Sequence, residues 1–223
     1  MRRLLWLLPA FALLALPARG GAPEWTLEGA FGYSAVLNAP LTIHQAGQPD
    51  LHFTAHYEGR PFESPPFYIL RLGRWQDGRA WEVEFQHQKL YLVDRPPEVG
   101  SFSISHGYNV LSGQRAWERG RTIYRLGAGI VASHPESVVR GRQLDPSGGV
   151  FGTGYYVSGP ALVAGIGQRW PIGRRWFVHW NVEVTAAWTR VPISGGDAEG
   201  ATVSVNLLAG LGRRFPARGT PPP

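Results

Sequence analysis

Residues 176–188 spell WFVHWNVEVTAAW, in which every second side chain from Trp176 to Trp188 is apolar. The side chains between them are mostly polar, and the side chains of a β-strand alternate between the two faces of a sheet. A strand of about 12 steps at ~3.3 Å, tilted by ~40°, rises roughly 30 Å, which matches the hydrocarbon layer of a bilayer. Tryptophans at both ends suit the two membrane interfaces. The segment therefore predicts a lipid-facing strand of an outer-membrane β-barrel.

The first 20 residues have the features of a secretory signal peptide. Arg2 and Arg3 form a basic start, residues 4–16 are apolar, and Ala18-Arg19-Gly20 offers a cleavage site after Gly20. No later run of 18 apolar residues exists, which excludes membrane-spanning helices. The absence of cysteine excludes a lipid-modified N-terminus and a disulfide framework. We therefore expect export through the general secretory route to the bacterial outer membrane.

The composition fits a single barrel domain after the signal peptide. Loss of the three signal-peptide arginines lowers the formal net charge from +6 to +3. No stripe of basic residues interleaved with aromatic residues is present, so we expect no nucleic-acid partner. Basic loops against anionic lipopolysaccharide are the expected use of the positive charge. The moderate hydrophobic fraction of 43% suits a barrel with a polar interior.

Alternating segments bounded by turn residues recur along the chain and predict eight strands. They are Leu51–Tyr57, Phe67–Trp75, Trp81–Val93, Ser101–Leu111, Thr122–Ala132, Tyr156–Gln168, Trp176–Thr189 and Thr202–Phe215. We predict an all-β, closed antiparallel transmembrane β-barrel over residues 51–215, followed by a flexible Pro-rich tail, residues 216–223. The tight connections at 76–79 and 171–174 should face the periplasm, and the longer ones at 134–151 and 191–200 the outside.

Residues 21–50 form an N-terminal segment that offers further strands. Residues 25–37 alternate well, and a barrel with both ends in the periplasm needs an even strand number. The alternative of ten strands adds residues 25–37 and Leu41–Gln45, the latter paired to Leu51–Tyr57. We favour eight strands, with the N-terminal segment outside the barrel.

The alternation also predicts which side chains point into the barrel. Directly paired residues share a face, so Arg71 and Glu84 should pair across the tight turn, and Glu183 should lie near Asn206. The interior polar network is predicted to contain Arg71, Glu84, Arg125, His179, Glu183 and Asn206. An eight-stranded barrel is just wide enough for its side chains to fill it, so this network should act as a plug. A water-filled pore would need ten or more strands.

Two histidines break the apolar outer face. In the alternation set by Trp81, His87 faces lipid, and in that set by Phe102 and Ile104, His106 faces lipid too. The paired strands put His87 opposite His106 or Tyr108. Polar groups facing lipid cost free energy, so the cluster either lies at headgroup level or acts on lipid. A β-bulge at His106-Gly107 is the alternative, and Ser105 and His106 should point to opposite faces.

Other polar residues suggest binding rather than catalysis. The longest external connection holds His134, Glu136, Arg140 and Arg142, which are candidates for binding a ligand. His52 and His56 lie about 13 Å apart if they occupy one strand, too far to share an ion. We therefore predict no metal site and no cofactor.

The whole chain resembles the small outer-membrane barrels of the OmpX, PagP and PagL group in its signal peptide, strand count, aromatic girdles and last strand. Leu72-Gly73-Arg74-Trp75 before a tight turn and Trp81 resembles the acyltransferases of that group. The resemblance implies a catalytic histidine at His56. Where those enzymes need an Asp-Ser pair, this chain has Gln86-His87-Gln88-Lys89, and His106-Gly107-Tyr108 lacks the serine of the deacylases.

Two hypotheses for function follow. The first is a non-enzymatic barrel with a structural, adhesive or ligand-binding role through external loops. The second is a lipid A-modifying acyl enzyme with a site on or near His56, His87, His106 and Tyr108. In both cases we expect a monomer that contacts outer-membrane lipids and lipopolysaccharide. The pattern from Leu207 to Phe215 resembles the terminal strand signal that the barrel-assembly machinery recognises.

Overall fold

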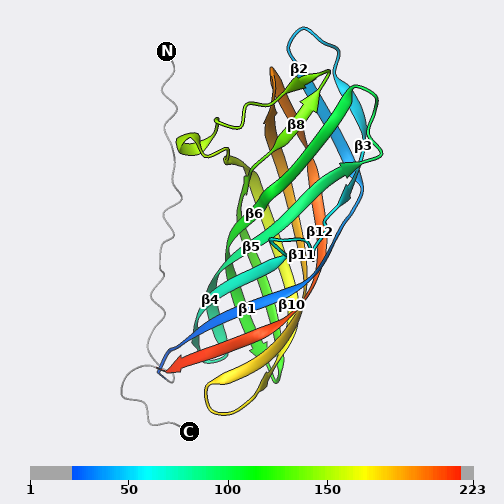
Figure 1. The fold of residues 1–223 in the computed structure, drawn as a ribbon. Coiled ribbons are helices and arrows are strands. Elements are labelled where there is room, and N and C mark those ends of the chain that lie inside the picture. Colours follow the sequence, from blue (N-terminus) through cyan, green and yellow to red (C-terminus); the bar gives the residue numbers. More distant parts are fainter. Residues whose placement is uncertain (1–21, 217–223) are drawn as a thin grey trace.

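The computed structural model describes residues 22–216 (Figure 1). The predicted signal peptide, residues 1–20, and the tail beyond Pro216 lie outside the described residues. The strands are β1 Glu24–Val36, β2 Ala39–Gln45, β3 Leu51–Glu58, β4 Tyr68–Gln76, β5 Arg79–Val93, β6 Val99–Arg119, β7 Thr122–Ser133, β8 Glu136–Val139, β9 Arg142–Gln143, β10 Tyr156–Pro171, β11 Trp176–Ile193 and β12 Gly196–Pro216. All twelve belong to one antiparallel sheet, and a single 3-10 turn, Val150–Gly152, lies outside it. The predicted all-β antiparallel architecture is confirmed.

The strands are connected in a continuous series of pairings. Following hydrogen-bonded neighbours from β1 through β4, β5, β6, β7, β10, β11 and β12 leads back to β1. Nearer the other end of the molecule, β2 and β3 take the places of β1 and β4 between β12 and β5. The short strand β8 continues β7 along β6, and β9 pairs with β8.

The N-terminal segment is part of the sheet. Strands β1 and β2 run one after the other along β12, from Glu24 opposite Pro216 to Gln45 opposite Gly196. The alternation of residues 25–37 therefore does form a strand, and Leu41–Gln45 pairs with β3 as the ten-strand alternative expected. Leaving this segment outside the barrel was wrong, because β12 would then lack its neighbour.

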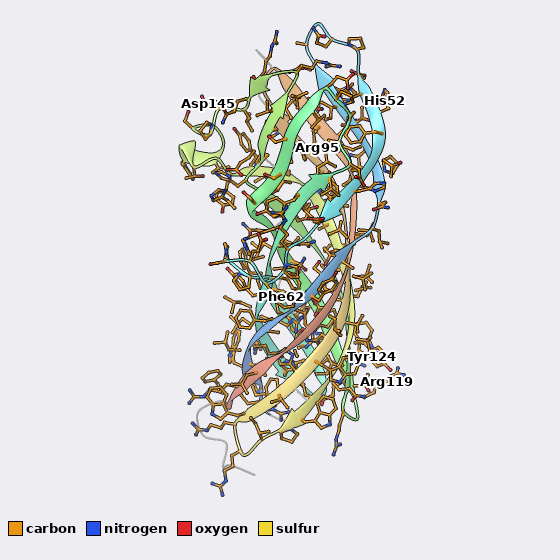
Figure 2. The ribbon with its side chains drawn as sticks, turned by 45° about the vertical axis from the view of Figure 1, so that its right-hand side comes forward. His52, Phe62, Arg95, Arg119, Tyr124 and Asp145 are labelled. Atoms are coloured by element: carbon orange, nitrogen blue, oxygen red, sulfur yellow. The ribbon has the colours of Figure 1, made fainter. Side chains whose placement is uncertain are left out.

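The wall that the sheet forms is interrupted at one place, where strand pairing is missing. Strand β1 pairs with β4 up to Phe31, and β2 pairs with β3 from Ala39, so no ladder partner on this side joins residues 32–38. Residues 59–67 connect β3 to β4, and we call them the strap. Lys89 of β5 donates to the carbonyl of Ser64 in the strap, whereas Phe67 at its end is buried with Ile69 and Leu208. Figure 2 shows Phe62 of the strap about half-way along the molecule, and its exposed fraction is 80%.

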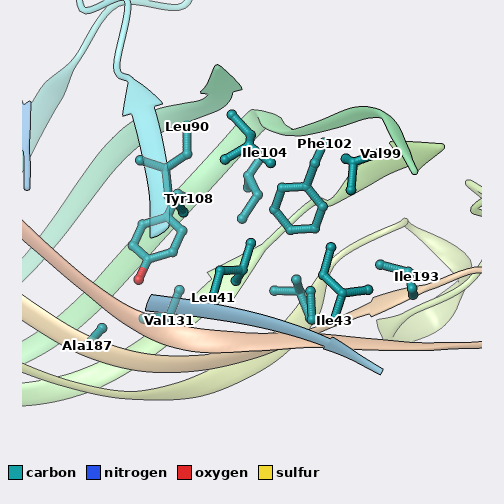
Figure 3. Close-up of a cluster of buried hydrophobic side chains, with 14 of the residues drawn as sticks. Leu41, Ile43, Leu90, Val99, Phe102, Ile104, Tyr108, Val131, Ala187 and Ile193 are labelled. Atoms are coloured by element: carbon teal, nitrogen blue, oxygen red, sulfur yellow. The ribbon is translucent and has the colours of Figure 1, made fainter. Parts of the chain in front are cut away.

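The polarity of the sheet inverts along its length. In the part that contains β1 and β4, apolar side chains such as Trp81 and Val83 of β5 point outward. In the part that contains β2 and β3, Leu90 and Leu92 of the same strand point inward. There they join a buried apolar cluster with Leu41, Ile43 and Phe102, which Figure 3 shows. We call the part with β1 and β4 the lower part and the part with β2 and β3 the upper part. The lower part thus presents apolar side chains on its outer face, and the upper part buries them inside, as a water-soluble protein does.

The two ends of the molecule differ in their turns. The β4–β5, β6–β7 and β10–β11 turns lie at the end where β1 begins and β12 ends, the lower end in Figure 1. The predicted long connection at 191–200 is instead strand on both sides of a tight turn at Ser194-Gly195. The predicted loop at 134–151 contains β8 and β9 and pairs with β6. No helix in residues 22–216 is long and apolar enough to span a membrane.

Arginines collect at the lower end. They are Arg74, Arg79, Arg115, Arg119, Arg121, Arg174, Arg175, Arg213 and Arg214. Figure 2 shows Arg119 and Tyr124 at the end opposite to His52 and Asp145. Most of the exposed positive charge therefore lies at the tight-turn end rather than at the end of the longer connections.

Candidate functional site

Three buried arginines and four buried glutamates lie together on the inner face of the lower part. Arg71 of β4 contacts Glu28 at 2.8 Å and also contacts Glu84 and Glu183. Arg71 and Glu84 stand directly opposite each other in the register of β4 and β5. Each of these four residues is at most 1% exposed, and they come from four different strands. A buried charge is tolerated only when it is paired and hydrogen-bonded, so these ion pairs hold the four strands together.

Arg125 and Arg169 extend the ion cluster toward the lower end. Arg125 donates to Glu82 at 2.7 Å and to Asn181 at 2.8 Å. Arg169 contacts Glu28, and its guanidinium lies 4.4 Å from the centre of the Trp75 ring. With Glu28, Glu82, Glu84 and Glu183 against three arginines, the buried formal charges nearly cancel. We call these seven residues the ion cluster.

Amides and hydroxyls line the interior above and beside the ion cluster. Ser34 donates to Asn206 at 2.7 Å, and Asn206 donates to Thr185 at 3.3 Å. His179 lies 2.9 Å from the Asn181 amide, and Glu183 is the register partner of Asn206. The six residues expected in the interior network are therefore all buried on the inner face.

Glu82 of the ion cluster follows from the alternation that places Trp81 outward, whereas sequence reasoning missed Glu28 and Arg169. Glu28 lies in the segment that was left outside the barrel, although the outward positions of Trp25, Leu27 and Phe31 already imply that it faces inward. Arg169 has the same parity as Gly165 and Gly167, one step beyond the predicted end of its strand. Extending the alternation at both ends would have found the two residues.

His87 lies on the outer face of β5 but is not exposed to lipid. Its ring stacks on Tyr68 at 5.2 Å, its Nδ1 lies 2.8 Å from Asn109, and only 5% of the residue is exposed. Next to it, Lys89 donates to the backbone carbonyl of Ser64 in the strap at 2.8 Å. His87 and Lys89 are therefore covered from outside, which contradicts the prediction of a lipid-facing histidine.

Tyr108 lies on the opposite face from His87. It is buried in the apolar cluster of the upper interior, and its register partner is Gln88. The partner of His87 is Asn109. The expected pairing of His87 with His106 or Tyr108 was therefore wrong, because Phe102, Ile104 and Tyr108 of β6 face inward, on the opposite face from His87. Beyond Tyr108, an irregularity in β6 shifts the register.

That irregularity is a β-bulge in β6. Ser133 pairs with Tyr108 and Glu136 pairs with Ser103. Four residues of β6, 104–107, lie between these partners, whereas only His134 and Pro135 lie between Ser133 and Glu136. Gly107 has a φ of 139°, a conformation that side chains rarely adopt. Phe102 and Ile104 point inward, so their parity was assigned to the wrong face, and the bulge nevertheless turns His106 outward.

The β-bulge gathers polar side chains on the outer surface. His106 Nδ1 lies 3.3 Å from Glu136 Oε1 and 3.1 Å from Ser105 Oγ. The rings of His106 and His134 are 4.9 Å apart, and the ring of Tyr155 is 5.0 Å from that of His134. The prediction that Ser105 and His106 point to opposite faces was wrong. We call His106, His134 and Glu136 the histidine cluster.

The histidine cluster does not have the geometry of a nucleophilic triad. In such a triad the serine contacts one ring nitrogen of the histidine and the carboxylate contacts the other. Here Ser105 and Glu136 both approach Nδ1 of His106, and Ser105 donates directly to Glu136. The serine is therefore paired with the acid rather than activated by the imidazole.

The remaining predicted site residues lie apart from one another. His56 of β3 pairs with Asp94 at 3.4 Å on the outer surface of the upper part. Arg140 donates to Gln45 at 3.2 Å and to the carbonyl of Pro49 at 2.7 Å, so it fastens β8 to the β2–β3 turn. Arg142 is exposed on β9. Within residues 22–216, no described contact joins His56 to His87 or to His106.

A second histidine lies among acids at the upper end. His44 contacts Asp50 at 2.9 Å and Glu199 at 3.6 Å. The hydrogen bond to Asp50 raises the pKa of His44 above its usual value, and the interaction with Glu199 acts in the same direction. This imidazole is thus already held by two carboxylates.

The interruption in the wall contains a pocket. It has a volume of about 330 Å³ and lies between β1 and the end of β3. Tyr33 and Val36 line one side, and Tyr57 and Pro61 line the other. Val36 and Tyr57 also pack against the apolar cluster of the upper interior. The pocket and the apolar cluster therefore share the side chains of Val36 and Tyr57.

No protein-family model matches the chain, and no curated protein sequence matches it. Several solved structures are similar. Outer membrane protein AlkL shares 14% identity at a TM-score of 0.48 over 93% of this chain and 97% of its own. Outer membrane protein OprG from Pseudomonas aeruginosa shares 9% at 0.44 over 88% and 97%. Ail, the attachment invasion locus protein of Yersinia pestis, shares 9% at 0.40 over 88% and 100%.

Proposed function

We propose that the protein is a bacterial outer-membrane β-barrel in which eight strands, β1, β4, β5, β6, β7, β10, β11 and β12, close around the membrane-spanning part. The series of pairings that returns to β1 supports closure. The outward Trp81, Trp176 and Trp188, with apolar residues between them, support a membrane belt. Short periplasmic turns are the rule in such barrels, which puts the arginine-rich end in the periplasm.

The membrane-spanning part is plugged in this proposal. An eight-stranded barrel leaves room only for its own side chains, and here the ion cluster fills it. Above it, the interior is filled by the apolar cluster around Phe102 and Tyr108. A hydrated ion would have to displace paired buried charges and then cross an apolar layer, so the axis is closed to ions.

The function lies in the outer part, which we propose to be a rigid ligand-binding platform. The observation that carries this proposal is the buried apolar cluster, because it stabilises strands that extend beyond the membrane belt. Five of the chain's seven histidines lie in this part, together with more acids than bases. The histidines are His44, His52, His56, His106 and His134; the acids are Asp50, Glu58, Glu63, Asp94, Glu98, Glu136, Asp145, Asp197 and Glu199. Such a surface favours cationic ligands over lipopolysaccharide phosphates.

Cysteine labelling tests the orientation, and planar-bilayer conductance tests the plug. The chain has no cysteine, so single-cysteine variants report without background. A membrane-impermeant maleimide should label Gln48→Cys in the β2–β3 turn on intact cells, and Arg174→Cys only after permeabilisation. Wild-type protein in planar bilayers should conduct no more than the bare bilayer. Labelling of Arg174→Cys on intact cells, or stepwise porin-like conductance, would contradict the proposal.

The alternative of a lipid A-modifying acyl enzyme has weaker support. Its candidates lie apart: His87 is buried against Tyr68 and Asn109, Tyr108 is inside, and His106 is exposed outside. The masses of lipid A test this alternative. If the protein is not an acyl enzyme, lipid A from cells with and without the protein should have identical masses. An acyl chain gained or lost would favour the enzyme.

A second candidate function is binding of a small amphipathic molecule in the pocket at the wall interruption. Tyr33, Val36 and Tyr57 offer contacts to an alkyl chain, and Glu58 and Arg60 in the same lining offer contacts to a polar head group. A diazirine-bearing alkane should cross-link within residues 33–36 and 57–61, and an excess of unlabelled alkane should suppress this. Ala35→Trp, which fills the pocket, should abolish it. Cross-links spread evenly over the lipid-facing wall would exclude a specific site.

A further inference from the structure

We propose that His106, His134 and Glu136 bind a divalent transition-metal ion, with Zn²⁺ as the best match. Each residue offers one ligand atom, and the three atoms lie within 4.8 Å of one another. Small rotations of exposed side chains bring such atoms to the 2.0–2.2 Å bond lengths that zinc takes with imidazole and carboxylate. These residues come together only through the β-bulge in β6, so the spacing of the sequence alone predicts no metal site here.

The backbone holds the histidine cluster in place from two sides. His134 donates its backbone N–H to the carbonyl of Gly107 at 3.1 Å. This hydrogen bond holds the backbone of His134 beside the β-bulge. Tyr155 donates its hydroxyl to the carbonyl of His106 at 2.7 Å, and its ring packs edge-on against His134. The two imidazoles are thus presented side by side by ordered backbone.

The side-chain chemistry fits a ligand set. Nδ1 of His134 is buried without a hydrogen-bond partner among the described residues, which is costly for an imidazole nitrogen unless it binds something else. Ser105 donates to Glu136, and such outer hydrogen bonds orient the carboxylate of a metal site. Two imidazoles and one carboxylate favour zinc, copper or nickel over calcium or magnesium, which prefer oxygen ligands alone.

The site has an open side. His106 is 64% exposed at its side chain, and the described residues supply three ligands, so a fourth position would be taken by water or by a ligand from outside. The other group of this kind, His44 with Asp197 and Glu199, supplies one imidazole that Asp50 already holds. That group therefore serves as an internal control.

The experiment measures Zn²⁺ and Co²⁺ binding to the whole protein, purified from membranes in detergent with a tag that contains no histidine. We expect one saturable site per chain by calorimetry and visible absorption bands of low-symmetry Co²⁺. His106→Gln and His134→Gln should each weaken binding at least tenfold, whereas His44→Gln should leave it unchanged. Heat-dependent migration on gels checks that every variant is folded.

Three outcomes would overturn the proposal: no saturable binding, binding indifferent to both His106→Gln and His134→Gln, or binding lost only in His44→Gln. The inference rests on the proposed function only in placing the site on the cell surface. If binding depends on His106 and His134 but Gln48→Cys is not labelled on intact cells, the metal site stands and the orientation fails.

Discussion

Replacing Arg71 with methionine should lower the free energy of unfolding by about 3–5 kcal/mol, as expected when one partner of a buried ion pair is removed. Arg71 contacts Glu28, Glu84 and Glu183, which are all buried. Methionine fills most of the space but removes the arginine that contacts Glu84 and Glu183, while Glu28 keeps its contacts to Arg125 and Arg169. Urea unfolding of the protein in lipid bilayers, followed by tryptophan fluorescence, measures the loss.

The matched control is Arg74→Met on the same strand. Arg74 lies on the outer face and is exposed, so its replacement should change the free energy of unfolding by no more than about 0.5 kcal/mol. Adding Glu84→Gln to Arg71→Met should recover part of the loss, because it removes one unpaired charge. Equal effects of the two arginine variants would show that the ion cluster does not stabilise the barrel.

The ion cluster could be predicted in part because alternation is reliable inside the membrane belt. There, apolar side chains face lipid and polar ones face inward, so Trp176–Trp188 fixes the inner positions of His179 and Glu183 without any structure. The same rule fails above the belt, where Phe102 and Leu90 point inward. A pattern of alternating hydrophobicity shows that a strand has an apolar face and a polar face. It does not show whether the apolar face points outward to lipid or inward to a protein core.

The histidine cluster could not be predicted for a different reason. Its residues come together through two extra residues in β6 and a positive φ at Gly107. A bulge at His106-Gly107 can be placed on the sequence, but the local pattern does not show that it turns His106 outward beside His134 and Glu136. The strap covers Lys89 in the same way, because nothing in the local pattern says that the backbone at Ser64 accepts a hydrogen bond from β5. Local periodicity predicts strands, whereas these contacts depend on connections between them.

Gly32→Ala should destabilise the protein by about 2–3 kcal/mol, at the upper end of the usual cost of overpacking. Gly32 lies opposite Leu208 where β1 pairs with β12. A Cβ there would overlap the carbonyl oxygen of Leu207 and lie 2.9 Å from the Cα of Leu208. Backbone atoms cannot move aside as a flexible side chain can, so β1 would have to separate from β12.

Gly29→Ala on the same strand isolates this effect from the general preferences of glycine. Its Cβ would meet only the Leu70 side chain, at 3.7 Å, which is an ordinary contact. We therefore expect it to be neutral or to stabilise by up to about 1 kcal/mol, because alanine restricts the unfolded chain. Since β1 has no ladder partner on its other side at Gly32, weakened pairing with β12 would also loosen the wall beside the pocket. Similar unfolding midpoints for Gly32→Ala and Gly29→Ala would show that β1 and β12 do not approach this closely.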